Sequence, residues 1–390
     1  MKDDFDQTYS RYGTYSTQWD YVKDRFGEEN LLPFSISDMD FKIPAGTRET
    51  LKAAVENGFF GYTRWNHQDF KGAIQHWFKS RFQLDIQSEW CVYSPSVIYS
   101  LSVFLQILTQ PSDGIVTLTP CYDAFYHTIR ENNRELVPCP LVYEKGRPYQ
   151  IDFKHLEVLF QNQKTTAFLL CNPHNPTGRA FTSTELQQII DLCNRYQIAI
   201  ITDEIHMDVR RAGVRHLPIL NFRQTINVPL VLLSSPSKTF NSPGLGGSYG
   251  IVPDEGLRNQ FLNILKGRDG LSSIPYPALL GLMDCYLHQG EWVEKLNEYV
   301  DETFRLVNAR LNQHPHLTFI IPEATYLGWI DISGLPMDMD ELQKRLVQEA
   351  KVAIMKGETY GPEGKHFLRL NLGAPRSKVL DGVERLLSVI

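Results

Sequence analysis

The feature that most constrains the fold is an alternation of short apolar runs with longer amphipathic segments through the middle of the chain. Helical patterns are clearest at 96–108 and 184–196, and Thr182 and Glu185 stand at the spacing of a capping box before the second. Strands alternating with helices predict an α/β fold with a mainly parallel sheet and right-handed crossovers. The apolar runs, whose continuous character suits strands covered on both faces, lie at 90–93, 115–118, 167–170, 198–201, 230–233 and 249–252.

The pattern changes after about residue 290, where an amphipathic helix is expected at 291–311. Strand-like TYLGWIDI (325–332), a helix at 340–351, strand-like HFLRLNL (366–372) and a last helix follow it. A chain of 390 residues is long for one core, so we expect two domains. The predicted large domain is 48–288, and the predicted smaller α+β domain joins 1–47 to 289–390.

Charge and composition exclude some classes of function. A net charge of −6 argues against a general binder of nucleic acid or of anionic membranes. The segment 1–20 is polar and acidic, without the apolar stretch of a secretory signal, and no run approaches the ~20 apolar residues that span a bilayer. The six cysteines show no CxxC pair, which is typical of reduced thiols. We therefore expect a cytoplasmic protein.

Polar and aromatic clusters follow four of the apolar runs. Ligands of open α/β sheets bind at the carboxyl ends of the strands, so these clusters are expected to meet in one cleft. The clusters are TPCYDAFY (119–126), CNPHNPTG (171–178), TDEIHMD (202–208) and SSPSKTF (234–240).

Each cluster also has a simpler interpretation. CNPHNPTG is compatible with an ordinary Pro/Asn/Gly turn, and Lys238 alone is compatible with a solvated loop lysine. A phosphate-binding loop of the Walker type is excluded, because residue 233 is not a glycine. A metal site in TDEIHMD is not expected, because an extended segment would point Asp203 away from Glu204 and His206.

Taken together, NPHNPTG, TDEIH and the serine–lysine segment resemble the fold-type-I pyridoxal-phosphate enzymes of the aspartate-aminotransferase superfamily. Nearly the whole chain resembles one branch of it, the MalY/PatB cystathionine β-lyases. This resemblance implies a three-layer aminotransferase-like large domain with a mainly parallel sheet, plus a smaller α+β domain. The segments that carry the closer resemblance include PFSISDMDF (33–41), SPSVIYS (94–100), LKGRDGLSS (265–273) and FLRLNLGAPRS (367–377).

The resemblance implies roles for the residues around the ring of pyridoxal 5'-phosphate. Lys238 matches the lysine that holds the cofactor covalently and acts as general base, a role that suits a primary amine on a flexible stem. Asp203 matches the carboxylate beside the pyridinium nitrogen, and Asn175 the donor to the phenolic oxygen. Tyr122 matches the stacking aromatic, whereas His206 stands where much of the superfamily has a tyrosine.

The resemblance also implies how the phosphate and the substrate are held. The backbone of Val97 and Ile98 and the hydroxyl of Ser235 match phosphate-binding groups. Tyr62 matches a tyrosine that reaches the phosphate from a neighbouring subunit, which implies a homodimer with the active site at its interface. Arg369 matches the arginine that binds the substrate carboxylate.

One departure concerns the phosphate, and one expectation concerns the substrate side chain. Many members of the superfamily carry a phosphate-binding arginine eight residues after the lysine, where this chain has Gly246. Arg64 and Trp65, next to Tyr62, are candidate contacts for the substrate side chain.

The implied reaction is β-elimination of L-cystathionine, or of cysteine and its other S-substituted forms, to a thiol, pyruvate and ammonia. An aminotransferase would use the same cofactor site. A different alternative is a regulatory interaction protein on this fold, either instead of an enzyme or as a second role, with a partner that the sequence does not name.

Overall fold

A seven-stranded sheet forms the centre of the larger part of the molecule. The computed structural model describes residues 4–390. Four neighbouring strand pairs are parallel, while β8 runs antiparallel to both of its neighbours. The predicted mainly parallel sheet is therefore confirmed. Its strands, in spatial order, are β2 (Cys91–Ser94), β8 (Ser248–Ile251), β7 (Leu230–Ser234), β6 (Ala199–Asp203), β5 (Thr165–Cys171), β3 (Gly114–Thr119) and β4 (Glu135–Pro140).

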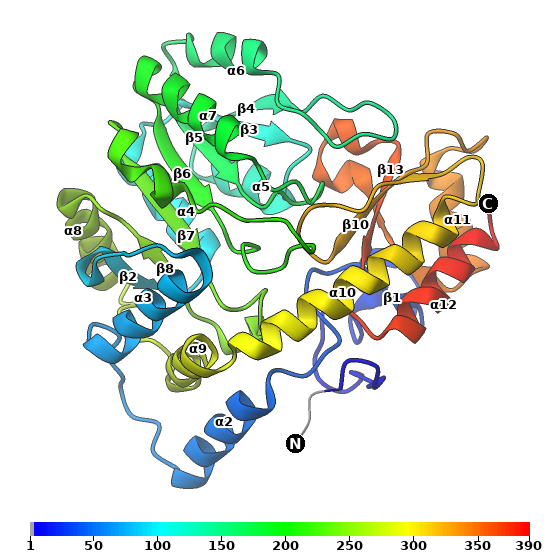
Figure 1. Cartoon of the computed structure of the whole chain (residues 1–390), viewed down its shortest axis with the longest axis horizontal. Helices are drawn as coiled ribbons and strands as arrows, with labels where there is room; N and C mark the ends of the chain where they lie inside the picture. Colours follow the sequence, from blue (N-terminus) through cyan, green and yellow to red (C-terminus); the bar gives the residue numbers. More distant parts are fainter. Residues whose placement is uncertain (1–3) are drawn as a thin grey trace.

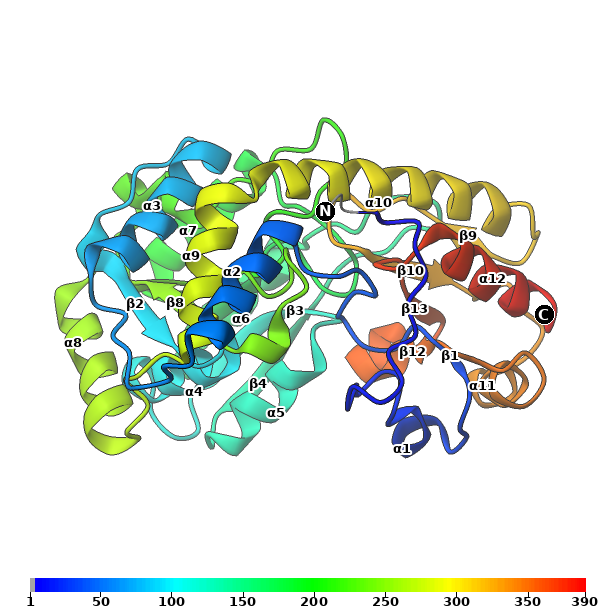
Figure 2. The ribbon, with the colours of Figure 1, turned by 90° about the horizontal axis from the view of Figure 1, so that it is seen from below.

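Helices cover both faces of this sheet, as Figure 2 shows. On one face α4 (Val97–Leu108) packs against β6, β7 and β8 and against α5 (Asp123–Glu131) and α8 (Glu255–Asn263). The other face carries α3 (Gln68–Phe82), α7 (Ser183–Tyr196) and α9 (Tyr276–His288), and α6 (Phe153–Phe160) packs against α7. The α/β prediction of a sheet between helices is thereby confirmed.

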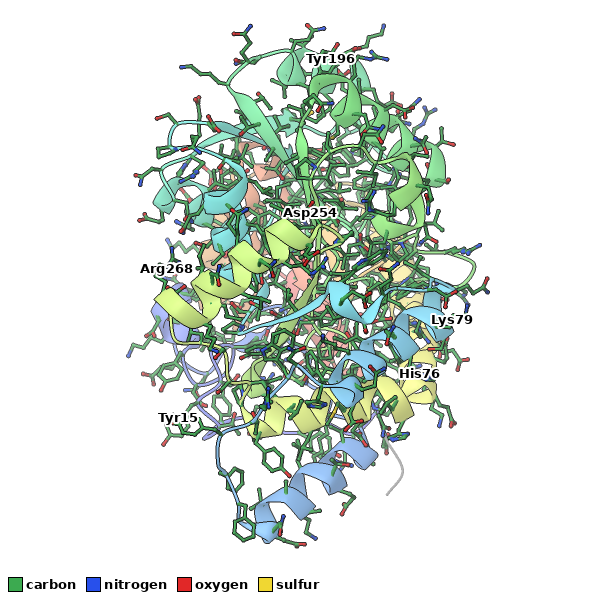
Figure 3. All side chains as sticks on the ribbon, turned by 90° about the vertical axis from the view of Figure 1, so that its left-hand side faces the viewer. Tyr15, His76, Lys79, Tyr196, Asp254 and Arg268 are labelled. Carbon is green, nitrogen blue, oxygen red and sulfur yellow. The ribbon has the colours of Figure 1, made fainter. Side chains whose placement is uncertain are left out.

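Polar side chains set the starts of several of these helices. The hydroxyl of Ser96 accepts a hydrogen bond from the backbone of Tyr99 at the start of α4. The capping box of Thr182 and Glu185 that the sequence predicts is present at the start of α7. Asp254, at the surface in Figure 3, accepts a hydrogen bond at the start of α8.

A second, four-stranded sheet lies in the part of the molecule built from both ends of the chain. The long helix α10 (Gly290–Leu311) connects the two parts in Figure 1. The remaining elements tie the N-terminal segment to the C-terminal third, because β1 pairs with β11. The four-stranded sheet consists, in spatial order, of β12 (Met355–Lys356), β13 (Phe367–Asn371), β10 (Leu327–Asp331) and β9 (Thr318–Phe319). Strands β1 (Leu32–Pro33) and β11 (Val352–Ala353) form a separate two-stranded sheet, and the helices of this part are α1 (Val22–Phe26), α11 (Met339–Gln348) and α12 (Arg376–Leu387).

The domain division at 48–288 stays a prediction. Helix α2 (Ala45–Asn57) crosses its first boundary and packs against α9, which ends at the second boundary. Two features of the sheet were not predicted. Strand β4 has no apolar run because it is an edge strand that contains Pro138. The direction of β8 depends on a connection that leaves no pattern in the sequence.

No helix within residues 4–390 is both long enough and apolar enough to cross a bilayer.

Candidate active site

The carboxyl ends of β5, β6 and β7 border a cavity of about 190 Å³. The cavity gathers side chains from the clusters that follow these strands, from the start of α4 and from the N-terminal segment. The structure thus brings eight of the ten predicted site residues to one place. These are Val97, Ile98, Tyr122, Asn175, Asp203, His206, Ser235 and Lys238.

Lys238 lies after the end of β7, with its half-buried side chain in the cavity wall. Its Nζ donates a hydrogen bond to the backbone carbonyl of Ser37 at 2.6 Å. Burial lowers the pKa of Lys238 to about 8, with Arg369 acting in the same direction and Asp38 and Asp203 opposing it. An amine with this pKa is neutral in a larger share of molecules near neutral pH than an exposed lysine, which suits a nucleophile or a general base.

Asp203 is the last residue of β6 and lies opposite Cys171 of β5. Its carboxylate accepts a hydrogen bond from the backbone of Ile205 at 3.1 Å. Burial raises the pKa of Asp203 to about 7, although the Ile205 hydrogen bond and the charge of Lys238 lower it. A cationic group beside this carboxyl would favour its ionised form.

The two acidic residues of TDEIH, Asp203 and Glu204, lie in different environments. Glu204 is fully buried away from the cavity, where it accepts hydrogen bonds from His216 Nε2 at 2.8 Å and from the backbone of Ile219 at 2.9 Å. His206 lies in the cavity wall with Asp203. An extended segment would point His206 away from Asp203, but β6 ends at Asp203 and the chain turns before His206, so both residues line the cavity. Among the described residues, no group of three or more His, Cys, Asp or Glu side chains is placed to hold a metal ion.

One end of the cavity is suited to an anion. The start of α4 contributes Val97 and Ile98, whose backbone N–H groups belong to the first turn and have no acceptor within the helix. The hydroxyl of Ser235 donates to the carbonyl of Gly247 at 2.9 Å and accepts from the backbone of Ser237 at 3.2 Å.

Gly246, where the superfamily arginine is missing, also lines this end of the cavity. It has a φ of +75°, which favours glycine, and an added Cβ would meet no atom within 4 Å. An anion in the cavity would be held here by backbone and hydroxyl groups of this chain.

Arg369 comes from the other sheet and lies beside this cavity. Its guanidinium donates hydrogen bonds to Asn175 Oδ1 at 3.3 Å and to the carbonyl of Ser35 at 2.8 Å. It also lies 4.5 Å from the centre of the Tyr360 ring. A buried guanidinium that faces an amide side chain and no acidic one is suited to a carboxylate ligand.

Comparison with known proteins decides the family. The family model for class I and II aminotransferases matches residues 29–386. The protein MalY of Escherichia coli is 42% identical over 99% of this chain and 98% of its own length, and the cystathionine β-lyase PatB of Bacillus subtilis is 35% identical over 98% of each. The chain belongs to the class I and II aminotransferase family, in its MalY/PatB branch. This confirms the resemblance on which the sequence interpretation depends.

A solved structure of this family shows the same fold. Cystalysin from Treponema denticola, described as containing a pyridoxal 5'-phosphate cofactor, superposes with a TM-score of 0.94 at 31% identity over 100% of this chain and 99% of its own. The aminotransferase-like α/β fold that the sequence predicts is therefore confirmed.

The cavity of this family member fits pyridoxal phosphate chemically. It holds an amine that can bond an aldehyde, a carboxyl that can pair with a ring nitrogen, and a helix start that can bind phosphate. Within the described residues, the buried His206 Nδ1 and Arg369 Nε have no hydrogen-bond partner. Burial lowers the pKa of His206 to about 3, with Lys238 and Arg369 acting in the same direction, so its ring is neutral and can donate and accept one hydrogen bond each.

The other predicted contacts do not lie in the cavity of their own chain. Tyr62 is 100% exposed. Arg64 is exposed and borders a separate hollow with Lys266. Trp65 is a core residue, whose ring packs against those of Phe70 and Tyr93.

Several residues of the cavity were not predicted. Ser96 could have been found as the N-cap before an apolar run. Ser37 leaves no signal, since it contributes a backbone carbonyl. Cys171 and Gly247 also line the cavity.

Proposed function

We propose that this chain is a pyridoxal-phosphate-dependent carbon–sulfur β-lyase. Its substrates are L-cystathionine and related S-substituted cysteines, which it converts to a thiol, pyruvate and ammonia. The observation that carries the proposal is the single cavity in which the buried amine of Lys238 and the carboxyl of Asp203 lie, with Arg369 beside it. The name of PatB, a cystathionine β-lyase, supports this choice of reaction.

Eight residues of the cavity would hold the cofactor. In the enzyme without substrate, Lys238 would bond its aldehyde carbon, while Asp203 would pair with its ring nitrogen and Tyr122 would stack on its ring. Asn175 and His206 would lie near its phenolic oxygen, and Val97, Ile98 and Ser235 would hold its phosphate. Bound pyridoxal phosphate supplies an electron sink for the electron pair left when the substrate loses its α-proton.

The chain's own residues then position the substrate and move one proton. Arg369 binds the α-carboxylate and so orients the Cα–H bond toward Lys238. The amine of Lys238, which is free once the substrate amino group has taken its place, accepts the α-proton. The bond between Cβ and sulfur breaks with its electron pair going to sulfur, which takes up a proton and leaves as the thiol. The remaining three-carbon fragment takes up water and gives pyruvate and ammonia.

We also propose that the enzyme is a homodimer in which Tyr62 contacts the phosphate bound by the other subunit. The exposure of Phe59 (77%) and Phe60 (55%) beside Tyr62 supports an interface here, since adjacent exposed aromatics are unusual on a free surface. The cytoplasmic location and the domain division at 48–288 stay predictions.

The test is incubation of the holoenzyme with L-cystathionine and no keto acid. Equimolar pyruvate and free thiol are expected. An aminotransferase on the same site would instead need a keto acid and would release no thiol. Amino-group transfer without thiol release would overturn the lyase proposal. A separate regulatory role would show as a cellular phenotype that a Lys238→Ala variant keeps.

A further inference from the structure

A second hollow, of about 470 Å³, lies between α1, α5, α11 and β12. Figure 2 shows α1, α11 and β12 in one part of the molecule and α5 in the other. Positive and negative side chains line the hollow together: Arg25, Lys344 and Lys356 with Asp123 and Asp340. Such a mixed lining suits a ligand that carries charges of both signs.

Two of these charged residues, Asp123 and Arg25, are connected to the candidate active site through a single neighbouring residue. Asp123 directly follows Tyr122, which lines the cavity. Arg25 donates from Nη1 to the sulfur of Met355 at 3.6 Å. Met355 is paired with Arg369 across β12 and β13, so the two side chains are neighbours on one face of that sheet. Arg25 therefore lies one side chain away from the proposed carboxylate site.

Neither residue is engaged by an opposite charge. Within residues 4–390, Arg25 and Asp123 form no ion pair, whereas the Nζ of Lys356 lies 4.0 Å from the carboxylate of Glu358. The charges of both residues also affect Tyr122, which lines the cavity. The pKa of Tyr122 is raised chiefly by burial and then by the charge of Asp123, while Arg369 and Arg25 lower it.

We propose that this hollow is the subsite for a zwitterionic amino-acid group at the far end of a thioether substrate, with Arg25 pairing with its carboxylate and Asp123 with its ammonium group. The inference rests on the proposed lyase function. It assigns to the enzyme a preference for thioethers that end in a second amino acid, such as cystathionine, over S-alkyl cysteines. The near end of such a substrate is held by Arg369, so its S-substituent extends past Tyr122 into the hollow.

The test compares thioether substrates that carry different distal charges. L-cystathionine carries both charges, S-(2-carboxyethyl)-L-cysteine only the carboxylate, S-(2-aminoethyl)-L-cysteine only the ammonium group, and S-ethyl-L-cysteine neither. Arg25→Gln is expected to lower kcat/KM about tenfold for the carboxyethyl substrate relative to the ethyl one, and Asp123→Asn about tenfold for the aminoethyl substrate. Both variants should also lower the ratio of kcat/KM for L-cystathionine to kcat/KM for S-ethyl-L-cysteine.

The matched controls remove one charge elsewhere on the same helices. Lys23→Gln on α1 and Glu131→Gln on α5 are exposed and lie outside the hollow, so all four rates should stay within twofold. A binding readout uses L,L-2,7-diaminosuberate, which has a methylene group in place of sulfur and no leaving group. Calorimetry should show about tenfold weaker binding to Arg25→Gln, with L-norleucine binding unchanged.

The outcomes separate the two proposals. Pyruvate from none of the four substrates with the wild-type holoenzyme would overturn the lyase function itself. Pyruvate from all four, with ratios and diaminosuberate binding that neither Arg25→Gln nor Asp123→Asn changes, would overturn the distal subsite and leave the lyase function standing.

Discussion

The side-chain amine of Lys238 donates a hydrogen bond to the backbone carbonyl of Ser37, which lies 201 residues earlier in the chain. The hydroxyl of Tyr326 donates to the same carbonyl at 2.9 Å. Asn241 holds Met39, two residues after Ser37, since it accepts from the Met39 backbone at 2.8 Å and donates to its carbonyl at 2.7 Å. The N-terminal segment therefore forms the wall of the cavity at Lys238, and the strand ends of the large sheet supply only part of the site.

Replacing Lys238 with alanine should abolish lyase activity, by at least about a thousandfold, because no other group holds both the cofactor bond and the α-proton. The wild-type holoenzyme should show an absorption band near ~420 nm that borohydride removes, and peptide mapping should place the reduced adduct on Lys238. Lys154→Ala, on the exposed face of α6, is the control and should keep both band and activity. An adduct on a different lysine would contradict the assignment.

Asp203 gives a prediction about the stability of the cofactor-free protein. Its pKa is about 7 when folded and near 4 when unfolded, so unfolding becomes easier as the carboxyl of the unfolded chain ionises first. This penalty is absent below pH ~4, grows between pH ~4 and ~7 and is constant above, where it is on the order of 4 kcal/mol. The Asp203→Asn variant has no carboxyl at this position and therefore lacks this pH-dependent penalty. The stability of the variant relative to wild type should therefore rise through this window in urea unfolding at several pH values.

The cofactor should reverse this difference. A protonated ring nitrogen beside Asp203 favours the ionised carboxyl, so pyridoxal phosphate should raise the Tm of the wild type more than that of Asp203→Asn. A stability difference that stays flat from pH 4 to 7 would show that the carboxyl is not buried without a cationic partner.

Local rules account for much of what the sequence could predict. The apolar runs of β3, β5, β6 and β7 are continuous because helices cover both faces of those strands. Polar side chains directly after such strands have to lie at one edge of a parallel sheet. That rule alone places Asn175, Asp203 and Lys238 close together, while their roles came from the family resemblance.

What the sequence could not predict depends on contacts between distant segments. Ser37 enters the site through a carbonyl group, and any residue type supplies one. Arg369 is identified by the family resemblance alone, since its contact with Asn175 from another sheet, at a sequence separation of 194 residues, leaves no local pattern. His206 likewise depends on the resemblance, because the period of a strand would point it away from Asp203, whereas β6 ends at Asp203. Only the paired register of β12 and β13 brings Arg25 near Arg369.

Arg369→Lys should raise KM for L-cystathionine by about thirtyfold with a smaller change in kcat. Lysine keeps the positive charge but loses the planar pair of donors that binds a carboxylate, and it cannot keep the contacts with both Asn175 and Ser35. Steady-state kinetics measures this. Arg345→Lys, a half-exposed ion-paired residue of α11, is the control and should leave KM unchanged. An unaltered KM in Arg369→Lys would move the carboxylate site elsewhere.

Tyr62 offers a test of the shared active site that does not depend on the absolute loss of activity. Tyr62→Ala should weaken cofactor binding about tenfold without lowering the Tm of the cofactor-free protein, because the ring is fully exposed in its own chain. Tyr15→Ala, another exposed tyrosine that Figure 3 shows at the surface, is the control and should change neither.

Mixing subunits then decides which chain Tyr62 serves. In a heterodimer of Lys238→Ala and Tyr62→Ala subunits, a tyrosine that reaches the other subunit restores one complete site, with the lysine from one chain and the tyrosine from its partner. At a pyridoxal phosphate concentration too low to load Tyr62→Ala homodimers, reassociated mixtures should then recover about a quarter of the wild-type activity, since half of the dimers are mixed and each has one complete site. If Tyr62 acts within its own subunit, no heterodimer has a complete site, and the mixture is no more active than the average of its components.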